Sequence, residues 1–173
     1  IENFYLRQGK FSFGNVAYTD GNRLDLKLNE LNVDQLSYDQ TLKNISVTGL
    51  GWQSAVVRIT GGKVERKSGD KNLPSISLST VRARNTDARY SDTGRVVNAY
   101  FHKINVNTLQ LGDGITMDVV DIAGSNVDFR NDLTGLSVKT FSLADIGSEL
   151  ENIQWYRHGV DTLESSIDRI SFI

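Results

Sequence analysis

The chain has 173 residues, a formal net charge of −2 and no cysteine. Its 39% hydrophobic content is too high for a disordered chain and sufficient for one domain with a core. The lack of cysteine excludes disulfides, thiolate catalysis and cysteine-ligated metal sites, and no apolar run is long enough for a transmembrane helix.

The chain opens IENFYLRQGK, without a methionine and without a basic and apolar leader. It is therefore expected to be a processed mature protein or a fragment of a longer chain. Its length favours a single domain over residues 1–173.

Strand-like segments follow one another along the chain. Alternating apolar and polar residues, rich in β-branched and aromatic types, predict strands centred on 11–13, 24–33, 45–47, 56–59, 76–81, 99–109, 117–122, 127–129 and 136–141. Turn signals such as Asp20-Gly21 and Thr93-Gly94 separate them. Connections this short favour antiparallel neighbours. Residues 142–150 are the best helix candidate, and the tail to residue 173 stays open between helix and strand.

An eight-residue phrase recurs along the sequence. KNISVTGL (43–50) reads apolar, any, apolar, any, any, apolar. The first apolar residues of the similar phrases are Leu31, Ile45, Ile76, Ile104 and Leu136. From Ile45 onward they lie about 30 residues apart, and a second strand phrase, such as GKVERKS (62–68), falls between them. This periodicity predicts units of two strands, which bury their apolar surface only by stacking on one another.

Three architectures satisfy this pattern. Each strand has one apolar face, so the sheet must curl, fold over or be covered. The sequence predicts a mainly β fold with little helix, as an elongated or curled antiparallel sheet of two-strand repeats; a parallel β-solenoid and a two-layer sandwich are the alternatives. The three-residue step from Val106 to Leu109 is expected to switch the sheet face, as a bulge or corner does. Ile45, Ile76, Ile104 and Leu136 are expected to stack in one row.

The first strands share a pattern of apolar residues and one glycine, formed by Phe4, Leu6, Gly9, Phe11, Phe13, Leu24, Leu26, Leu28, Leu31 and Val33. This pattern resembles a unit of the AsmA-like family of bacterial envelope proteins, and of the related TamB-like and bridge-like lipid-transfer proteins. A shortened copy lies at residues 125–143. The resemblance implies a long curled sheet without catalytic activity, whose apolar concave face binds or conducts lipid. It also implies a periplasmic or cell-envelope location, with lipid or another apolar ligand, and envelope proteins, as partners.

The resemblance and the alternation together name candidate site residues. The candidates for the lipid groove are Leu26, Leu28, Ile45, Val47, Ile104, Val106 and Val138. Arg82, Arg84 and Arg89 alternate along a strand in the most basic part of the chain, and are the candidates for binding an anionic group, outside the groove or at its rim. Nucleic acid is not an expected partner, because the chain is acidic overall and its aromatic residues do not cluster with arginine.

No known catalytic or phosphate-binding motif is present, and neither histidine has another metal ligand at a suitable spacing. The chain is therefore expected to be no enzyme and to hold no metal or cofactor. A carbohydrate-binding or adhesive domain, with Trp52 or Tyr156 on its surface, is the alternative function; Trp155 is expected to pack in the core. A polysaccharide-active enzyme using Asp118 and Asp121 is a more distant one.

Overall fold

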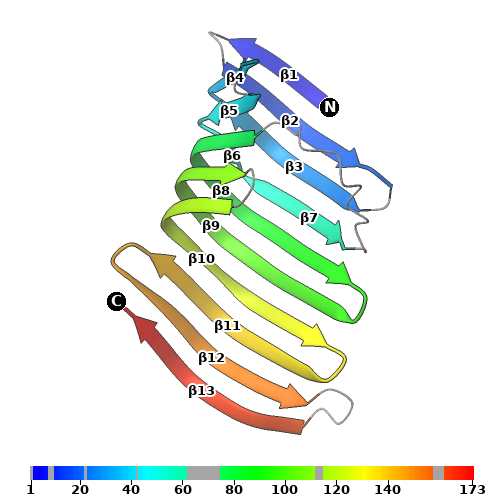
Figure 1. Cartoon of the computed structure of the whole chain (residues 1–173), viewed down its shortest axis with the longest axis vertical. Coiled ribbons are helices and arrows are strands. Elements are labelled where there is room, and N and C mark those ends of the chain that lie inside the picture. The colour runs from blue at the N-terminus through cyan, green and yellow to red at the C-terminus, as the bar shows by residue number, and fades with distance from the viewer. Residues whose placement is uncertain are drawn as a thin grey trace.

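The structure, a computed structural model, shows one β-sheet and no helix in the part of the chain that it describes (Figure 1). The described residues are 2–7, 10–21, 23–41, 43–61, 75–111, 115–157 and 162–173. The predicted mainly β fold is confirmed. The strand phrase expected at 62–68 lies outside the described residues.

Every described segment predicted as a strand lies within an observed strand, and the structure adds five further strands, at 2–7, 35–39, 51–52, 147–157 and 162–172. In chain order the strands are β1 (Glu2–Arg7), β2 (Lys10–Thr19), β3 (Leu24–Val33), β4 (Gln35–Asp39), β5 (Asn44–Thr48), β6 (Gly51–Trp52), β7 (Ser54–Thr60), β8 (Ser75–Asp92), β9 (Arg95–Leu111), β10 (Ile115–Asn131), β11 (Thr134–Ala144), β12 (Gly147–Arg157) and β13 (Thr162–Phe172). The segments 117–122 and 127–129, expected as two strands, are both part of β10. The helix expected over 142–150 is wrong, because this segment is the turn between β11 and β12 with the strand ends beside it.

The strands lie side by side as a ladder from β1 at one end to β13 at the other (Figure 1). Most neighbours are antiparallel, as expected. Strands β3 and β4 follow one line, and they pair antiparallel with the line formed by β5, β6 and β7. That second line pairs in parallel with β8, which is the exception to the expected arrangement.

The parallel pairing places equivalent residues of the sequence repeat opposite each other. Ile45 lies opposite Ile76, and the hydroxyls of Thr48 and Ser79, 31 residues apart in sequence, lie 3.0 Å from each other. The same offset continues through β6 and β7. Equivalent residues of consecutive units therefore stand next to each other along this part of the sheet.

The expected single row of repeat residues forms only in part. Ile45 and Ile76 are neighbours, but Ile104 lies opposite Ala83, and Leu136 lies opposite Phe129. The reason is that β9 and β11 belong to antiparallel hairpins, which reverse the chain direction. Later copies of the phrase therefore land on other rows of the same face.

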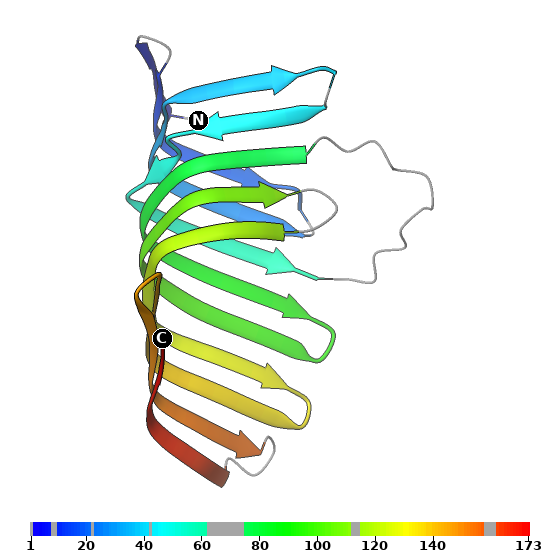
Figure 2. The same ribbon diagram turned by 60° about the vertical axis from the view of Figure 1, so that its left-hand side comes forward.

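The long strands β8, β9 and β10 curve strongly, so that the two arms of the sheet face each other (Figure 2). In β8, Leu78 and Val81 are three residues apart, as Val106 and Leu109 are in β9. All four side chains lie on one face, because Val81 pairs with Val106 and Leu78 pairs with Leu109. The extra residue is taken up by Thr80, whose φ of 58° is left-handed. The expectation that the step switches the sheet face is therefore wrong: the step bends the strand and keeps the face.

Left-handed residues recur elsewhere in the strands. They are Glu30 (φ 53°), Asn85 (φ 46°), Asn126 (φ 55°) and Asn152 (φ 50°). Asparagine tolerates this conformation better than most residues. Asn85 also ties three strands together, since its amide donates to the carbonyl of Gln53 and its carbonyl accepts from Tyr100.

The apolar face, defined as the face that carries Val81, Val106 and Ile122, lies on the inside of the bend. These three side chains are at most 7% exposed and form the centre of the core. Leu78 from one arm and Phe101 from the other both pack against them. Contacts from both arms to one cluster require the side chains to converge, as they do on a concave surface.

The core at the bend should dominate stability. Replacing Ile122 with alanine should lower the free energy of unfolding by about 2–4 kcal/mol, because the side chain is buried and leaves a cavity. Replacing Ile167, which is half exposed on the same face, should cost below about 1 kcal/mol. Urea unfolding measures both, and equal losses would contradict an open apolar face.

The left-handed conformation of Thr80 should cost stability, because a β-branched residue is strained there. Thr80→Gly should raise the free energy of unfolding by roughly 1 kcal/mol, after the entropy that glycine adds to the unfolded chain is subtracted. Thr108→Gly, in β9 at an exposed position without positive φ, is the control and should lower it by roughly 1 kcal/mol. The idea of a strained bend fails if both variants lose stability equally.

Candidate functional site

The structure brings all the sequence-predicted groove residues onto the apolar face. Directly paired residues share a face of a sheet, and alternate residues along a strand do so too. These rules place on that face Leu26, Leu28, Ile45, Val47, Ile104, Val106 and Val138. They lie at different heights along the strands, so they mark the extent of the face and do not form one compact pocket.

Rows of paired residues make the apolar face continuous. One row crosses the sheet from β2 to β13 through Val16, Leu28, Ala55, Thr86, Phe101, Gly124, Phe141, Leu150 and Ile170. A second crosses from β6 to β11 through Trp52, Ala83, Ile104, Ile122 and Leu143. Every residue of these two rows is uncharged. The floor of the bend is therefore an uncharged surface, in which Thr86 is the one polar side chain of the two rows.

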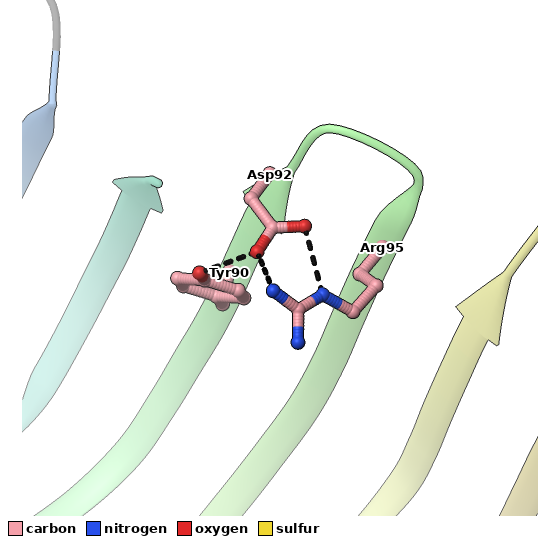
Figure 3. A network of polar contacts seen from close by, with 3 residues as sticks. All are labelled: Tyr90, Asp92 and Arg95. Carbon is pink, nitrogen blue, oxygen red and sulfur yellow. Dashed lines mark hydrogen bonds and ion pairs between the residues drawn. The ribbon is translucent and has the colours of Figure 1, made fainter. Parts of the chain in front are cut away.

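The border of this face at the β8–β9 hairpin is charged. Arg95 donates two hydrogen bonds to the carboxylate of Asp92, of 3.1 Å from Nε and 2.6 Å from Nη2, and the Tyr90 hydroxyl donates a third of 2.8 Å (Figure 3). The hydrogen bond from Arg95, followed by that from Tyr90, lowers the pKa of the Asp92 carboxyl. The bond to Asp92 raises the pKa of Tyr90. Tyr90 lies opposite Val97, so this network marks where the apolar surface ends.

Both tryptophans lie on the apolar face. The indole N–H of Trp52 donates to the hydroxyl of Thr86 at 2.8 Å, and the ring packs against the buried cluster. Thr86 is the one buried polar side chain in the described part of the chain, and this bond satisfies it. Trp155 is 40% exposed opposite Leu136, so its expected place in the core is wrong. The sheet has no second layer there in the described part that could cover it.

The three candidate arginines lie on the opposite face, which we call the polar face, and not at the rim of the groove. Each of them is next along β8 to an apolar-face residue, and all three are exposed. Arg82 and Arg84 line one cavity, while Arg89 lines a separate smaller one of about 170 Å³ with Arg58 and Asp87. The structure therefore groups two of the three.

The cavity at Arg82 and Arg84 has a volume of about 510 Å³. It was missed by the sequence analysis, because its lining comes from several strands, namely β3, β6, β8, β9 and β10. The polar side chains in that lining include Asn32, Gln53, Lys103, Asn105 and Asn107. The one signal in the sequence is Gly51, a residue without a side chain directly after the phrase that ends at Leu50.

Residues considered for other chemistry are engaged in hydrogen bonds. Asp118 accepts from the amide of Asn107, and Asp121 pairs with the ammonium of Lys103. His102 lies 3.0 Å from the Ser125 hydroxyl on an exposed part of β9. Among the described residues there is no group of three histidine or carboxylate side chains placed to hold a metal. A membrane-crossing helix is likewise not found in that part of the chain.

The network at the hairpin gives a prediction for pH titration. Because the pKa of Asp92 is lowered in the folded chain, its interactions stabilise the fold above the ordinary pKa of about 3.9 and lose that effect as the pH falls through the folded-state value. In ¹³C NMR, the Asp92 carboxyl should titrate below 3.9, and Arg95→Gln should move its midpoint upward. Arg130→Gln, which removes the partner of Asp128, should leave it unchanged. A midpoint insensitive to Arg95 would contradict the pairing.

Comparison with known proteins leaves the function to be argued from the chain itself. No family model and no curated protein matches the sequence. The two features that any functional account must explain are therefore the apolar face inside the bend and the basic cavity on the polar face.

Proposed function

We propose that this chain binds lipid acyl chains along the apolar face, as a non-catalytic segment of an envelope protein. The observation that carries the proposal is an apolar surface without charge along its floor that lies inside the bend and is left open by the described residues. Only seven of the described hydrophobic residues are buried. A water-soluble sheet of this size gains stability if something apolar covers the rest.

Exposed apolar side chains are spread over the whole of this face. Leu36 on β4 is 56% exposed, while Met117 on β10 and Ile167 on β13 are each 49% exposed. Monomeric proteins rarely expose contiguous apolar patches larger than a few hundred Å². A surface that extends across the strands of the ladder fits an elongated apolar ligand better than a compact one.

The dimensions of the face also favour an acyl chain. Neighbouring strands lie about 4.8 Å apart, so the row from β2 to β13 is on the order of 40 Å long. One leaflet of a bilayer has a hydrocarbon thickness of about 15 Å, which is close to the length of one acyl chain. The row is longer than one chain, so acyl chains can lie along it one after another, as conduction of lipid requires.

Hydrogen-bonding capacity argues against a sugar on this face. The one buried polar side chain of the rows, that of Thr86, is already engaged by Trp52. A carbohydrate needs several donors and acceptors beside an aromatic ring, whereas Trp52 packs against the apolar cluster of Val81, Val106 and Ile122, and Trp155 lies between Leu136 and Ser165. Tyr156, on the polar face, is half-buried and donates to Asp128 at 3.0 Å. None of these aromatic residues supports the carbohydrate alternative.

The resemblance to AsmA-like proteins supports the same proposal from the sequence side. Under it, the chain acts in the cell envelope, outside the cytoplasm, with lipid as its ligand and envelope proteins as partners. Its role is to shield acyl chains from water while they move along the sheet.

The two tryptophans allow a direct test, because both lie on the apolar face. Phospholipid brominated on an acyl chain should quench their fluorescence, whereas the same lipid without bromine should not. Trp52→Phe and Trp155→Phe then show which end of the face is occupied. Lack of quenching, together with no lipid in extracts of the purified protein, would exclude the proposal.

Matched variants separate the two faces of one strand. Met117→Asp and Ile167→Asp place a carboxylate among the acyl chains and should weaken lipid binding by roughly tenfold or more. Thr116→Asp and Ser166→Asp place the same charge on the neighbouring, exposed positions of the polar face and should leave binding unchanged. All four sites are exposed, so the fold should survive, as circular dichroism can check. Equal losses in both pairs would show that the apolar face is not the binding surface.

A further inference from the structure

The polar face carries a cavity beside a residue that has no side chain. Asn32, Gly51, Arg82 and Asn105 are consecutive partners in one row across β3, β6, β8 and β9. Because Gly51 has no side chain, the row is interrupted at its second position. The cavity of about 510 Å³ lies at this interruption.

The lining of the cavity is basic. It contains three cationic side chains, those of Arg82, Arg84 and Lys103, and no acidic residue. Lys103 is neutralised by Asp121, which stands outside the lining. In the described part of the chain, Arg82 and Arg84 have no acidic partner, although the exposed arginines Arg58 and Arg95 do. Two positive charges in the cavity are thus uncompensated.

Their spacing suits one anionic group. Arg82 and Arg84 are two positions apart on a strand, so they project from the same face roughly 7 Å apart at their origin. Long arginine side chains can converge over that distance on one phosphate, which the planar guanidinium binds with two parallel hydrogen bonds. The amides of Gln53 and Asn105, in the same lining, can donate to and accept from hydroxyl groups beside it.

We propose that this cavity binds a phosphate ester carried on a hydroxylated group, such as a sugar or glycerol phosphate. Its volume lies within the roughly 300–1,000 Å³ typical of small-ligand sites. The site is on the opposite face from the acyl-binding surface, so it is independent of the function proposed above. The phosphate ester can come from a soluble molecule or from a lipid headgroup, and the chemistry of recognition is the same.

Titration of ¹⁵N-labelled protein with glucose 6-phosphate tests the site. Binding should shift the backbone amide signals of Gly51 and Arg82, whereas glucose should not. The double variant Arg82→Gln, Arg84→Gln should weaken binding by about tenfold or more, because each substitution removes a charged hydrogen-bond donor to the phosphate. Arg89→Gln lies on the same strand and face but outside this cavity, and should bind like the wild type.

Further arms of the experiment identify the source of the phosphate and control for simple charge. The site is assigned to a lipid headgroup if the wild type sediments with phosphatidylcholine vesicles that contain phosphatidylglycerol but not with vesicles of pure phosphatidylcholine. The double variant should then sediment with neither kind of vesicle. Glucose 6-phosphate binding without vesicle binding assigns it to a soluble ester. The proposal is overturned if inorganic sulfate binds as well as glucose 6-phosphate, if Arg89→Gln is as damaging as the double variant, or if neither ligand form binds.

Discussion

The structure depends on one constraint: a strand must turn a corner without moving its apolar residues to the other side. In a regular strand an insertion of one residue reverses every side chain beyond it. Here the extra residue at the corner of β8 is Thr80, and its left-handed conformation restores the alternation beyond it. The bend and the continuity of the apolar face therefore have the same origin. Without it, the charged residues next to Val81 and Ala83 would point into the core.

The repeat explains why the corners lie beside each other. The line from β5 to β7 pairs with β8 at a constant offset, so the left-handed Gly49 stands next to Thr80, with its N–H bonded to the carbonyl of Ser79. Two strands that bend at the same height can keep their hydrogen bonds through the bend. A sheet made of unrelated strands would have to match its bends one by one, whereas a repeated phrase aligns them wherever units pair in parallel.

Much of the fold follows from local pattern, and what was missed is non-local. The alternation in Leu24–Val33 predicted β3 with its observed bounds, because each side chain of a strand reports its own face. The three-residue step was expected to switch the sheet face, because a threonine such as Thr80 gives no sign in the sequence of a positive φ. Helical spacing over 142–150 came from Leu143 and Leu150 standing on the two facing strands of one hairpin. That the groove candidates share one face of the sheet could be predicted from alternation. The basic cavity could not, because Asn32 and Lys103 meet beside Arg82 only through the register of three separate pairings.

The ladder order has a mechanical consequence. In the described part of the chain, β1 and β13 lie at the two ends of the ladder, so the first and last strands are far apart across the sheet (Figure 1). A force that pulls these ends apart acts across the strands, in the direction of the hydrogen bonds between them. Such a load opens one pair at a time, like a zipper, instead of shearing many bonds together. The sheet is thus compliant along the axis on which its apolar surface is longest, and stiff along its strands.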